Sequence, residues 1–359
     1  MLDLFPSRTA GPFGRPQKHA RAGRIPVTVV TGFLGAGKTT LVRRFLSTPE
    51  GRGTAVIINE FGAVGIDDAL VRSSADETVL LGNGCLCCVL RSDLQLALRR
   101  LVSERERGTV PHFRRVMIET SGLADPGPIL QTFATDRALG GEFHVELTLA
   151  VADAATGEAT LRWSAEARKQ IVLADRVIVA KTDLVEPSAT ALLTERLRAL
   201  NPHADLAAAS NGAIEPSRLT EAPALQPPAR GAAGFFAEAE HSDGIASFVV
   251  AEDRPVAWDA FARTMETLTA LRGPDLLRVK GFLNVAGCRG PVLVEFVQHL
   301  AHPPVELQQW PDSGHATRLV FITRNIREQA VRDLFAATRA LMPSLRAEGG
   351  TVHKSDAMR

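Results

Sequence analysis

A glycine-rich segment at residues 32–39 reads Gly-Phe-Leu-Gly-Ala-Gly-Lys-Thr and fits the G-x-x-x-x-G-K-[ST] pattern of phosphate-binding loops. We expect a strand at 25–31 directly before it and a helix at 38–46 directly after it, which distinguishes such a loop from a glycine-rich turn without a ligand. Backbone amides at the helix N-terminus would bind phosphate oxygens, Lys38 would reach the β- and γ-phosphates, and the Thr39 hydroxyl would bind Mg²⁺. The predicted phosphate-side residues are Gly32, Gly35, Ala36, Gly37, Lys38, Thr39 and Thr40.

A second polar segment at residues 119–126 reads Glu-Thr-Ser-Gly-Leu-Ala-Asp-Pro and follows an expected strand at 115–119. An acid at the carboxyl end of a strand beside a phosphate-binding loop normally holds the magnesium shell or orients water. We therefore predict that Glu119 binds Mg²⁺ and acts in catalysis with Lys38. Gly122 would let the backbone approach a γ-phosphate closely.

A third segment at residues 180–183 reads Ala-Lys-Thr-Asp and resembles the N-K-x-D guanine motif, with alanine in place of asparagine. The Asp183 carboxylate can accept hydrogen bonds from N1 and N2 of guanine, which adenine cannot supply. Lys181 would cover the ring with its aliphatic stem, and Ser210 and Asn211 would add backbone contacts to the base. These residues favour guanine over adenine, although Ala180 removes one polar contact.

Three of the four cysteines, Cys85, Cys87 and Cys88, fall within four residues. Cys85 and Cys88 have the C-x-x-C spacing that binds tetrahedral zinc, and Cys87 would supply a third thiolate. Three soft ligands with one open position suit an ion that is transferred, such as zinc or cobalt. A structural metal, a redox disulfide and plain packing are the alternatives. Metal handling is favoured because no second C-x-x-C and no thioredoxin-like context are present.

A loop at residues 59–67 reads Asn-Glu-Phe-Gly-Ala-Val-Gly-Ile-Asp and follows an expected strand at 55–59, where a switch loop would lie. Glu60 is a candidate to complete the thiol site. Asp67 is a candidate to sense magnesium and to take part in catalysis. Solvated loop acids are the alternative, and the residues alone do not decide between the two.

The elements that must position these motifs alternate between strand and helix, which predicts an α/β fold of the P-loop type with a doubly wound, mostly parallel sheet. Ligands bind beyond the carboxyl ends of the strands in such a sheet. The remaining elements expected in this domain are strands at 78–81, 145–151, 176–180 and 204–209 and helices at 90–105, 127–134, 166–173 and 191–200.

A proline-rich and Gly/Ala-rich stretch at 214–243 indicates a linker. Beyond it the sequence predicts a smaller α+β carboxyl-terminal domain with an antiparallel sheet. Its expected strands lie at 245–251, 276–285, 291–298 and 318–323, and its helices at 258–271 and 326–341. The predicted organisation is a flexible tail at 1–24, a P-loop domain at 25–213, the linker, a second domain at 244–345 and a tail at 346–359.

Composition argues against several classes of protein. Hydrophobic residues make up 45% and charged residues 23% of the 359 residues, as in an ordinary globular chain. The net charge of +1 gives no sign of a nucleic-acid or membrane partner, and no apolar run approaches the length of a bilayer span. The Arg-rich first 24 residues lack the apolar core of a secretory signal, although a transit segment is an alternative to a frayed tail. We expect a cytoplasmic monomer or homodimer in a reducing compartment.

Together the motifs resemble the CobW-type metallochaperone GTPases, relatives of the nickel-insertion GTPases of urease and hydrogenase. The resemblance covers about residues 25–330. In the first domain it rests on 31–40 (TGFLGAGKTT), 58–67 (INEFGAVGID), 82–88 (GNGCLCC) and 119–126 (ETSGLADP). In the second it rests on 278–281 (RVKG), Trp310 and 318–322 (RLVFI).

The resemblance implies binding of GTP and GDP, GTP hydrolysis, Mg²⁺ at the phosphates, and Zn²⁺ or Co²⁺ on the cysteine motif. It also implies delivery of that ion to a client metalloprotein, which the carboxyl-terminal domain helps to contact, and it makes Glu60 and Asp67 switch residues. Two departures are Ala180 and the absence of the histidine-rich stretch that many relatives carry between the domains, so metal storage is not expected.

Two other classes of function remain open on the residues alone. A P-loop small-molecule kinase or nucleotidase with a structural metal would require an acceptor pocket and a mobile lid, and no lid is evident. An inactive scaffold with an occupied loop is disfavoured by Lys38, Thr39 and Glu119.

Overall fold

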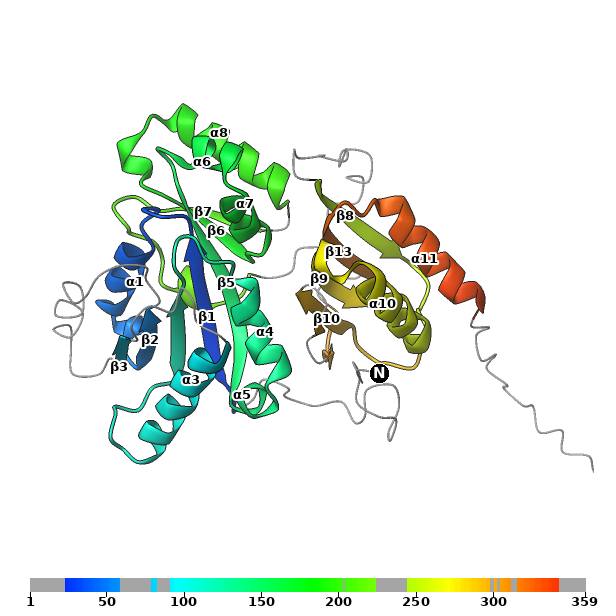
Figure 1. Ribbon diagram of the computed structural model, residues 1–359, viewed down its shortest axis with the longest axis horizontal. Coiled ribbons are helices and arrows are strands. Elements are labelled where there is room, and N and C mark those ends of the chain that lie inside the picture. Colours follow the sequence, from blue (N-terminus) through cyan, green and yellow to red (C-terminus); the bar gives the residue numbers. More distant parts are fainter. Residues whose placement is uncertain are drawn as a thin grey trace, which may run out of the picture.

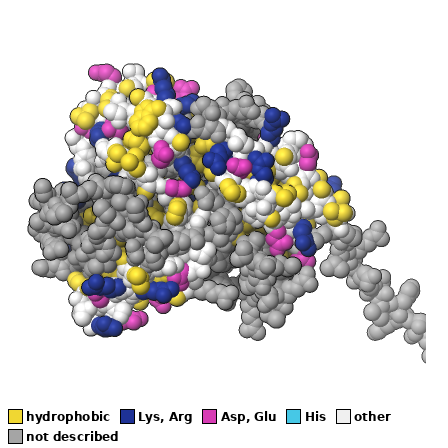
Figure 2. Space-filling view, in the orientation of Figure 1, with side chains coloured by type: hydrophobic (Ala, Val, Ile, Leu, Met, Phe, Trp, Pro, Cys, Tyr) yellow, Lys and Arg dark blue, Asp and Glu magenta, His cyan; other side chains and the backbone are white. Residues whose placement is uncertain are grey.

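The computed structural model describes residues 23–58, 79–82, 91–202, 204–223, 244–297, 300–301, 304–310 and 315–341, which form two domains (Figure 1). Among these residues, no helix combines the length and apolar character that a bilayer span requires. On the face shown in Figure 2, basic and acidic side chains are interspersed over the described surface, as the net charge near zero suggests.

The first domain is built on a seven-stranded sheet with the order β3-β2-β4-β1-β5-β6-β7. All pairings between these neighbours are parallel. The strands are β1 (Ile25–Gly32), β2 (Thr54–Ile58), β3 (Val79–Gly82), β4 (Arg115–Glu119), β5 (Phe143–Asp153), β6 (Arg176–Ala180) and β7 (Asp205–Ala208). The short β-branched runs of β1, β2, β4 and β6 are buried almost throughout, as parallel strands covered on both faces require.

Helices cover both faces of this sheet, so the prediction of a doubly wound sheet is confirmed. Helices α1 (Lys38–Leu46) and α9 (Ser217–Thr220) pack on one face through side chains such as Phe45 and Leu219. The other face is covered by α3 (Arg91–Glu106), α4 (Gly127–Thr135), α5 (Arg137–Glu142), α6 (Gly157–Trp163), α7 (Ala165–Val172) and α8 (Pro187–Leu200).

Short helices are among the elements that the sequence did not predict. The helices α5 and α6 span six and seven residues, too few to show a helical period. Helix α9 falls inside the predicted linker, yet Leu219 is buried in the core and its carbonyl accepts a hydrogen bond from Thr28 Oγ1 (3.1 Å). The first residues after 214 therefore pack with the P-loop domain, and 224–243 lie outside the described residues.

The second domain contains an antiparallel sheet with the order β11-β10-β9-β13-β8, and β12 pairs with β10. Its predicted α+β architecture is confirmed. The elements are β8 (Ile245–Glu252), α10 (Trp258–Arg272), β9 (Leu276–Leu283), β10 (Val292–Val297), β11 (Leu300–Ala301), β12 (Val305–Glu306), β13 (Thr317–Arg324) and α11 (Glu328–Leu341). Helices α10 and α11 cover one face of the sheet, where Phe261 and Val331 are fully buried (Figure 1).

The opposite face of this sheet packs against the first domain. Val172 at the end of α7 joins an apolar cluster with Ile245, Leu277 and Ile322 of the second domain. Val297 of β10 enters the core that lies around α4. The two domains therefore share buried apolar surface.

A buried ion cluster lies within the same interface and uses the RVKG segment of β9. Arg278 donates to the carbonyl of Leu173 (2.7 Å) and to Asp175 Oδ1 (2.5 Å), and Lys280 donates to the same Oδ1 (2.6 Å). Glu295 of β10 accepts a further bond from Arg278 (3.1 Å). Burial opposes ionisation of Asp175, yet the charges of Arg278 and Lys280 hold the pKa of that carboxyl well below its usual range.

Candidate functional site

The phosphate-binding loop connects β1 to α1, and its glycines adopt conformations that other residues rarely reach. Gly35 and Gly37 have φ values of 72° and 100° and turn the chain into the first turn of α1. Gly32 has φ of 139° and lies so close to β5 that a Cβ there would come within 2.3 Å of the Val151 carbonyl oxygen. The glycine pattern is therefore required by the shape of this loop.

The two side chains at the start of α1 face the carboxyl edge of the sheet. Lys38 is buried, and its Nζ donates to the carbonyls of Gly32 (2.9 Å) and Phe33 (3.2 Å), so the ammonium lies over the loop. Thr39 Oγ1 donates to Glu119 Oε1 at 2.6 Å. The fold thus brings a hydroxyl and a carboxylate close enough to bind the same ion, and oxygen ligands of this kind suit Mg²⁺.

The ends of four neighbouring strands are aligned at this edge. Glu119 of β4 is in register with Val30 of β1 on one side and with Ile58 of β2 on the other, and Ile58 is in register with Gly82 of β3. The segments that follow β2 and β3 are those with the predicted switch acids and cysteines. The described ends of β2 and β3 lie one and two strand spacings from Glu119, which is about 5 and 10 Å.

The segment 119–126 leaves β4 next to the phosphate-binding loop. The Thr120 amide donates to the Val30 carbonyl (2.9 Å), which continues the strand pairing beyond Glu119. Gly122 packs so closely on the loop that a Cβ would lie 2.6 Å from the Leu34 amide nitrogen. A side chain at residue 122 would force the two segments apart, which explains why a glycine is needed at this position.

The residues predicted to read the base come together at the ends of β6 and β7. Asp183 Oδ1 accepts a hydrogen bond from the Asn211 amide (2.7 Å), and Thr182 Oγ1 donates to the Ala209 carbonyl (3.2 Å). Ser210 lies between these two anchor points and pairs with Ala213 in a bridge that closes the turn.

Helix α1 supports this turn from the phosphate side. Arg44 donates to the Asn211 carbonyl (2.5 Å), and Gly212, with φ of 70°, packs against Thr40. Thr40, predicted as a phosphate-side residue, therefore lies beside the turn that contains Ser210 and Asn211.

Asp153 contacts a predicted site residue and is a candidate that the sequence reasoning missed. It ends β5, and its Oδ2 accepts a hydrogen bond from Lys181 Nζ (2.7 Å). Burial opposes ionisation of Asp153, but hydrogen bonds from Lys181 and from the Ala155 amide outweigh it and hold the pKa of the carboxyl below its ordinary value. Lys181 itself has φ of 61°, an uncommon conformation that the ion pair helps to hold. The expected strand ended at 151, two residues before Asp153, so the strand-end signal used for Glu119 did not identify this acid.

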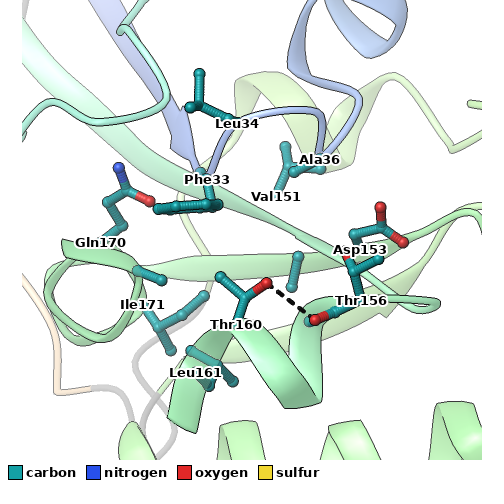
Figure 3. A pocket seen from close by; sticks show the side chains of 14 residues that line it. Phe33, Leu34, Ala36, Val151, Asp153, Thr156, Thr160, Leu161, Gln170 and Ile171 are labelled. Atoms are coloured by element: carbon teal, nitrogen blue, oxygen red, sulfur yellow. Dashed lines mark hydrogen bonds between the residues drawn. The ribbon is translucent and has the colours of Figure 1, made fainter. Parts of the chain in front are cut away.

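A cavity lies under the phosphate-binding loop, between it and helices α6 and α7 (Figure 3). Phe33 and Leu34 line it from the loop, Thr160 from α6, and Gln170 and Ile171 from α7. Most of the side chains that line it are apolar, and its volume of about 30 Å³ is enough for a water molecule but not for a nucleotide.

Five predicted site residues lie outside the described residues: Glu60, Asp67, Cys85, Cys87 and Cys88. Within the described part of the chain no group of three or more His, Cys, Asp or Glu residues is placed to hold a metal ion. The cysteine site and the roles of the two acids therefore stay predictions.

Comparison with known proteins gives matches to both domains. Residues 26–208 match the family described as CobW/HypB/UreG, nucleotide-binding domain, and residues 245–339 match the family described as cobalamin synthesis protein cobW C-terminal domain. The zinc chaperone YjiA of Escherichia coli (strain K12) is 34% identical over 322 residues, which cover 88% of this chain and 99% of YjiA. The zinc chaperone CobW of Pseudomonas aeruginosa is 31% identical over 368 residues, which cover 89% and 92% of the two chains. The crystal structure of Zn(II)-bound YjiA GTPase from E. coli gives a TM-score of 0.67 at 30% identity, with 88% of this chain and 99% of that chain covered.

Proposed function

The chain belongs to the CobW/HypB/UreG family, and on this premise we propose that it is a GTP-hydrolysing metallochaperone that delivers zinc to a client metalloprotein. Two relatives that align over most of this chain are named zinc chaperones, and the structural neighbour is named a GTPase. Because the alignments include both domains, the proposal concerns the chain as a whole.

The observation that supports the proposal best is the alignment of strand ends around Glu119. The phosphate-binding loop, the predicted switch segment 59–67, the cysteine segment 83–88 and the segment 119–126 all leave the sheet at the same edge, from adjacent strands. A change at Glu119 would therefore act about two strand spacings, roughly 10 Å, from the end of β3, after which the cysteine segment follows in the chain. This proximity is the physical basis for coupling a nucleotide to a metal.

The nucleotide would be held by residues from three parts of the first domain. Lys38 and the loop amides would bind the phosphates, and Asp183 with Lys181 would bind guanine. Thr39 and Glu119 would hold Mg²⁺, which when bound neutralises charge on the β- and γ-phosphates. Glu119, Asp67 and Lys38 are the proposed catalytic residues, and Gly122 would present backbone to the γ-phosphate.

The transferred ion would bind to the thiolates of Cys85, Cys87 and Cys88, with Glu60 as a further ligand. Thiolates bind both Zn²⁺ and Co²⁺, and the names of the relatives favour zinc. Cys288 is a poor candidate because burial, with a smaller effect of Glu306, raises the pKa of its thiol to about 11. A thiol with such a pKa is protonated at neutral pH, whereas the thiolate is the ligand.

In the proposed cycle the segments 59–67 and 119–126 close on the γ-phosphate in the GTP state and shape the metal site. Hydrolysis removes the γ-phosphate contacts, both segments relax, and the thiolates release the ion to the client. Affinity for zinc must then differ between the GDP and GTP states, because a ligand that binds two states equally cannot be released by a change between them.

The test uses the untagged chain, with zinc and cobalt counted by elemental analysis in the presence of GDP or a non-hydrolysable GTP analogue. We expect one ion per chain that binds more tightly with the GTP analogue and is lost when Cys85, Cys87 and Cys88 are all changed to serine. Cys288→Ser is the matched control and should retain the ion. Equal affinity in both nucleotide states would refute the coupling, and retention of the ion by the triple variant would refute the site.

A further inference from the structure

Helix α7 contacts the segment 119–126 through two adjacent side chains that no motif identified. We infer that Gln170 is a positioning residue for hydrolysis, because it holds the Gly122 peptide in place beside the phosphate-binding loop. This inference rests on the proposed GTP hydrolysis and adds to it a residue that would act through Gly122 rather than on the nucleotide.

The contact between Gln170 and the segment is direct and buried. Gln170 is 1% exposed, and its Nε2 donates to the carbonyls of Gly122 (3.0 Å) and Ala124 (3.0 Å). Both acceptors are backbone carbonyls, so the side-chain amide must present its nitrogen to them, and its orientation is determined. The amide thus bridges two peptide groups that lie two residues apart.

The two hydrogen bonds from Gln170 restrain the backbone at Gly122. Gly122 has more backbone freedom than any residue with a Cβ, and its position against Leu34 leaves no room for a side chain that could restrict it. Before Gly122 the segment is fixed by strand pairing at Thr120, and beyond it by the ion pair between Asp125 and Lys169 of α7. Gln170 is the described contact that fixes the carbonyl of Gly122 itself.

The hydrogen bonds of the Gln170 amide indicate that its main role is to hold the segment 119–126. The Gln170 Oε1 atom is buried toward the cavity under Phe33, and none of the described residues donates a hydrogen bond to it (Figure 3). Replacing the amide by an apolar group of similar length therefore removes two donor contacts to the segment and no other protein hydrogen bond within the described structure. Gln170→Met is the closest such replacement.

The residue that follows α8, Asn201, contacts the carboxyl-terminal end of α7 and supplies the matched control. Asn201 is also buried, and its Nδ2 donates to the carbonyls of Ile171 (2.9 Å), Val172 (3.2 Å) and Ala174 (2.9 Å). Asn201→Leu removes the same kind of bond from α7 but does not alter a contact to the segment 119–126. A purely structural role of Gln170 predicts that the two variants behave alike.

The experiment measures the single-turnover rate of GTP hydrolysis, the affinities for fluorescent GDP and for a GTP analogue, and the unfolding temperature. For Gln170→Met we expect a fall of about tenfold to thirtyfold in the hydrolysis rate, the scale of two lost hydrogen bonds, with GDP affinity within about twofold of wild type. For Asn201→Leu we expect an equal or larger fall in unfolding temperature and a hydrolysis rate within about twofold of wild type.

A second variant keeps the inference testable if Gln170→Met does not fold. Lys169 is partly exposed, so Lys169→Met should fold, lose the ion pair to Asp125, and lower the rate by about twofold to fivefold with unchanged GDP affinity. A wild-type rate in Gln170→Met, or equal losses in Gln170→Met and Asn201→Leu, would overturn the inference. A wild-type chain that does not hydrolyse GTP would instead refute the proposed function.

Discussion

Replacing Asp175 by alanine should destabilise the contact between the two domains by about 3–5 kcal/mol, the usual consequence of leaving buried charges without their partner. In the structure Asp175 Oδ1 accepts hydrogen bonds from Arg278 (2.5 Å) and Lys280 (2.6 Å), and Oδ2 accepts one from the Thr148 amide (2.9 Å). The side chains of Asp175 and Arg278 are only 7% and 6% exposed, so water cannot replace the lost carboxylate. In the variant Glu295 would be the remaining acid beside two cations.

The assay is differential scanning calorimetry combined with small-angle X-ray scattering. A loss of 3–5 kcal/mol should lower the unfolding temperature by about 10 °C in a chain of this size, and the radius of gyration should increase if the domains separate before either unfolds. Scattering distinguishes an opened interface from general destabilisation, which would leave the native radius unchanged below the transition.

Asp205→Ala is the control for this prediction. Asp205 also bridges two cations, Arg176 and Arg218, at 2.7 Å each, but the cluster lies within the first domain and the Asp205 side chain is 29% exposed. The expected loss is about 1 kcal/mol with an unchanged radius of gyration. If Asp175→Ala costs no more than Asp205→Ala, the reasoning that burial makes the interdomain cluster strong is refuted.

Three further outcomes are expected. In Gly32→Ala the new Cβ would lie 2.3 Å from the Val151 carbonyl oxygen, so we expect this variant not to reach the native fold, as measured by circular dichroism. Gly35→Ala has open space around the new Cβ and should lower the free energy of unfolding by only about 1–2 kcal/mol. Equal effects of the two substitutions would contradict the steric argument. Asp183→Ala should lower the preference for GTP over ATP in competition binding by about 10- to 100-fold, and an unchanged preference would exclude this carboxylate from base recognition. The pKa of Asp175 is lower in the folded chain than in the unfolded one, so its stabilising effect is present above the ordinary aspartate pKa of about 3.9 and is lost as the pH falls below that value. The difference in unfolding free energy between wild type and Asp175→Asn should therefore shrink below about pH 4. A difference that stays constant with pH would contradict this assignment.

Much of the first domain could be predicted because its signals are local. The strands at 115–119 and 176–180 and the helix at 38–46 were predicted with the bounds that the structure shows. Each is a short apolar run that ends at a motif, and burial on both faces of a parallel sheet makes such runs easy to recognise. Short elements such as α5, α6 and α9 were missed because they are held by contacts with the rest of the fold rather than by their own periodicity.

The residues that act at a distance could not be predicted in the same way. Gln170 lies in an ordinary amphipathic helix, and only the crossing of α7 over the segment 119–126 brings it to Gly122, 48 residues away. Arg278 and Lys280 were noted for their resemblance to a family motif, but nothing in the sequence indicates that their partner is Asp175, more than 100 residues earlier.

The chemistry predicted for this protein can be read from its amino-acid sequence: glycines and Lys38 for phosphate, Thr39 and Glu119 for magnesium, and three cysteines for a soft metal ion. These follow from residue types at fixed spacing, because each motif forms from contacts within a few residues. The folded structure was needed to show which strand ends lie side by side, that Lys181 pairs with Asp153, and how the second domain packs against the first. Such pairings depend on strand order and on the packing of distant helices, which local residue patterns do not encode.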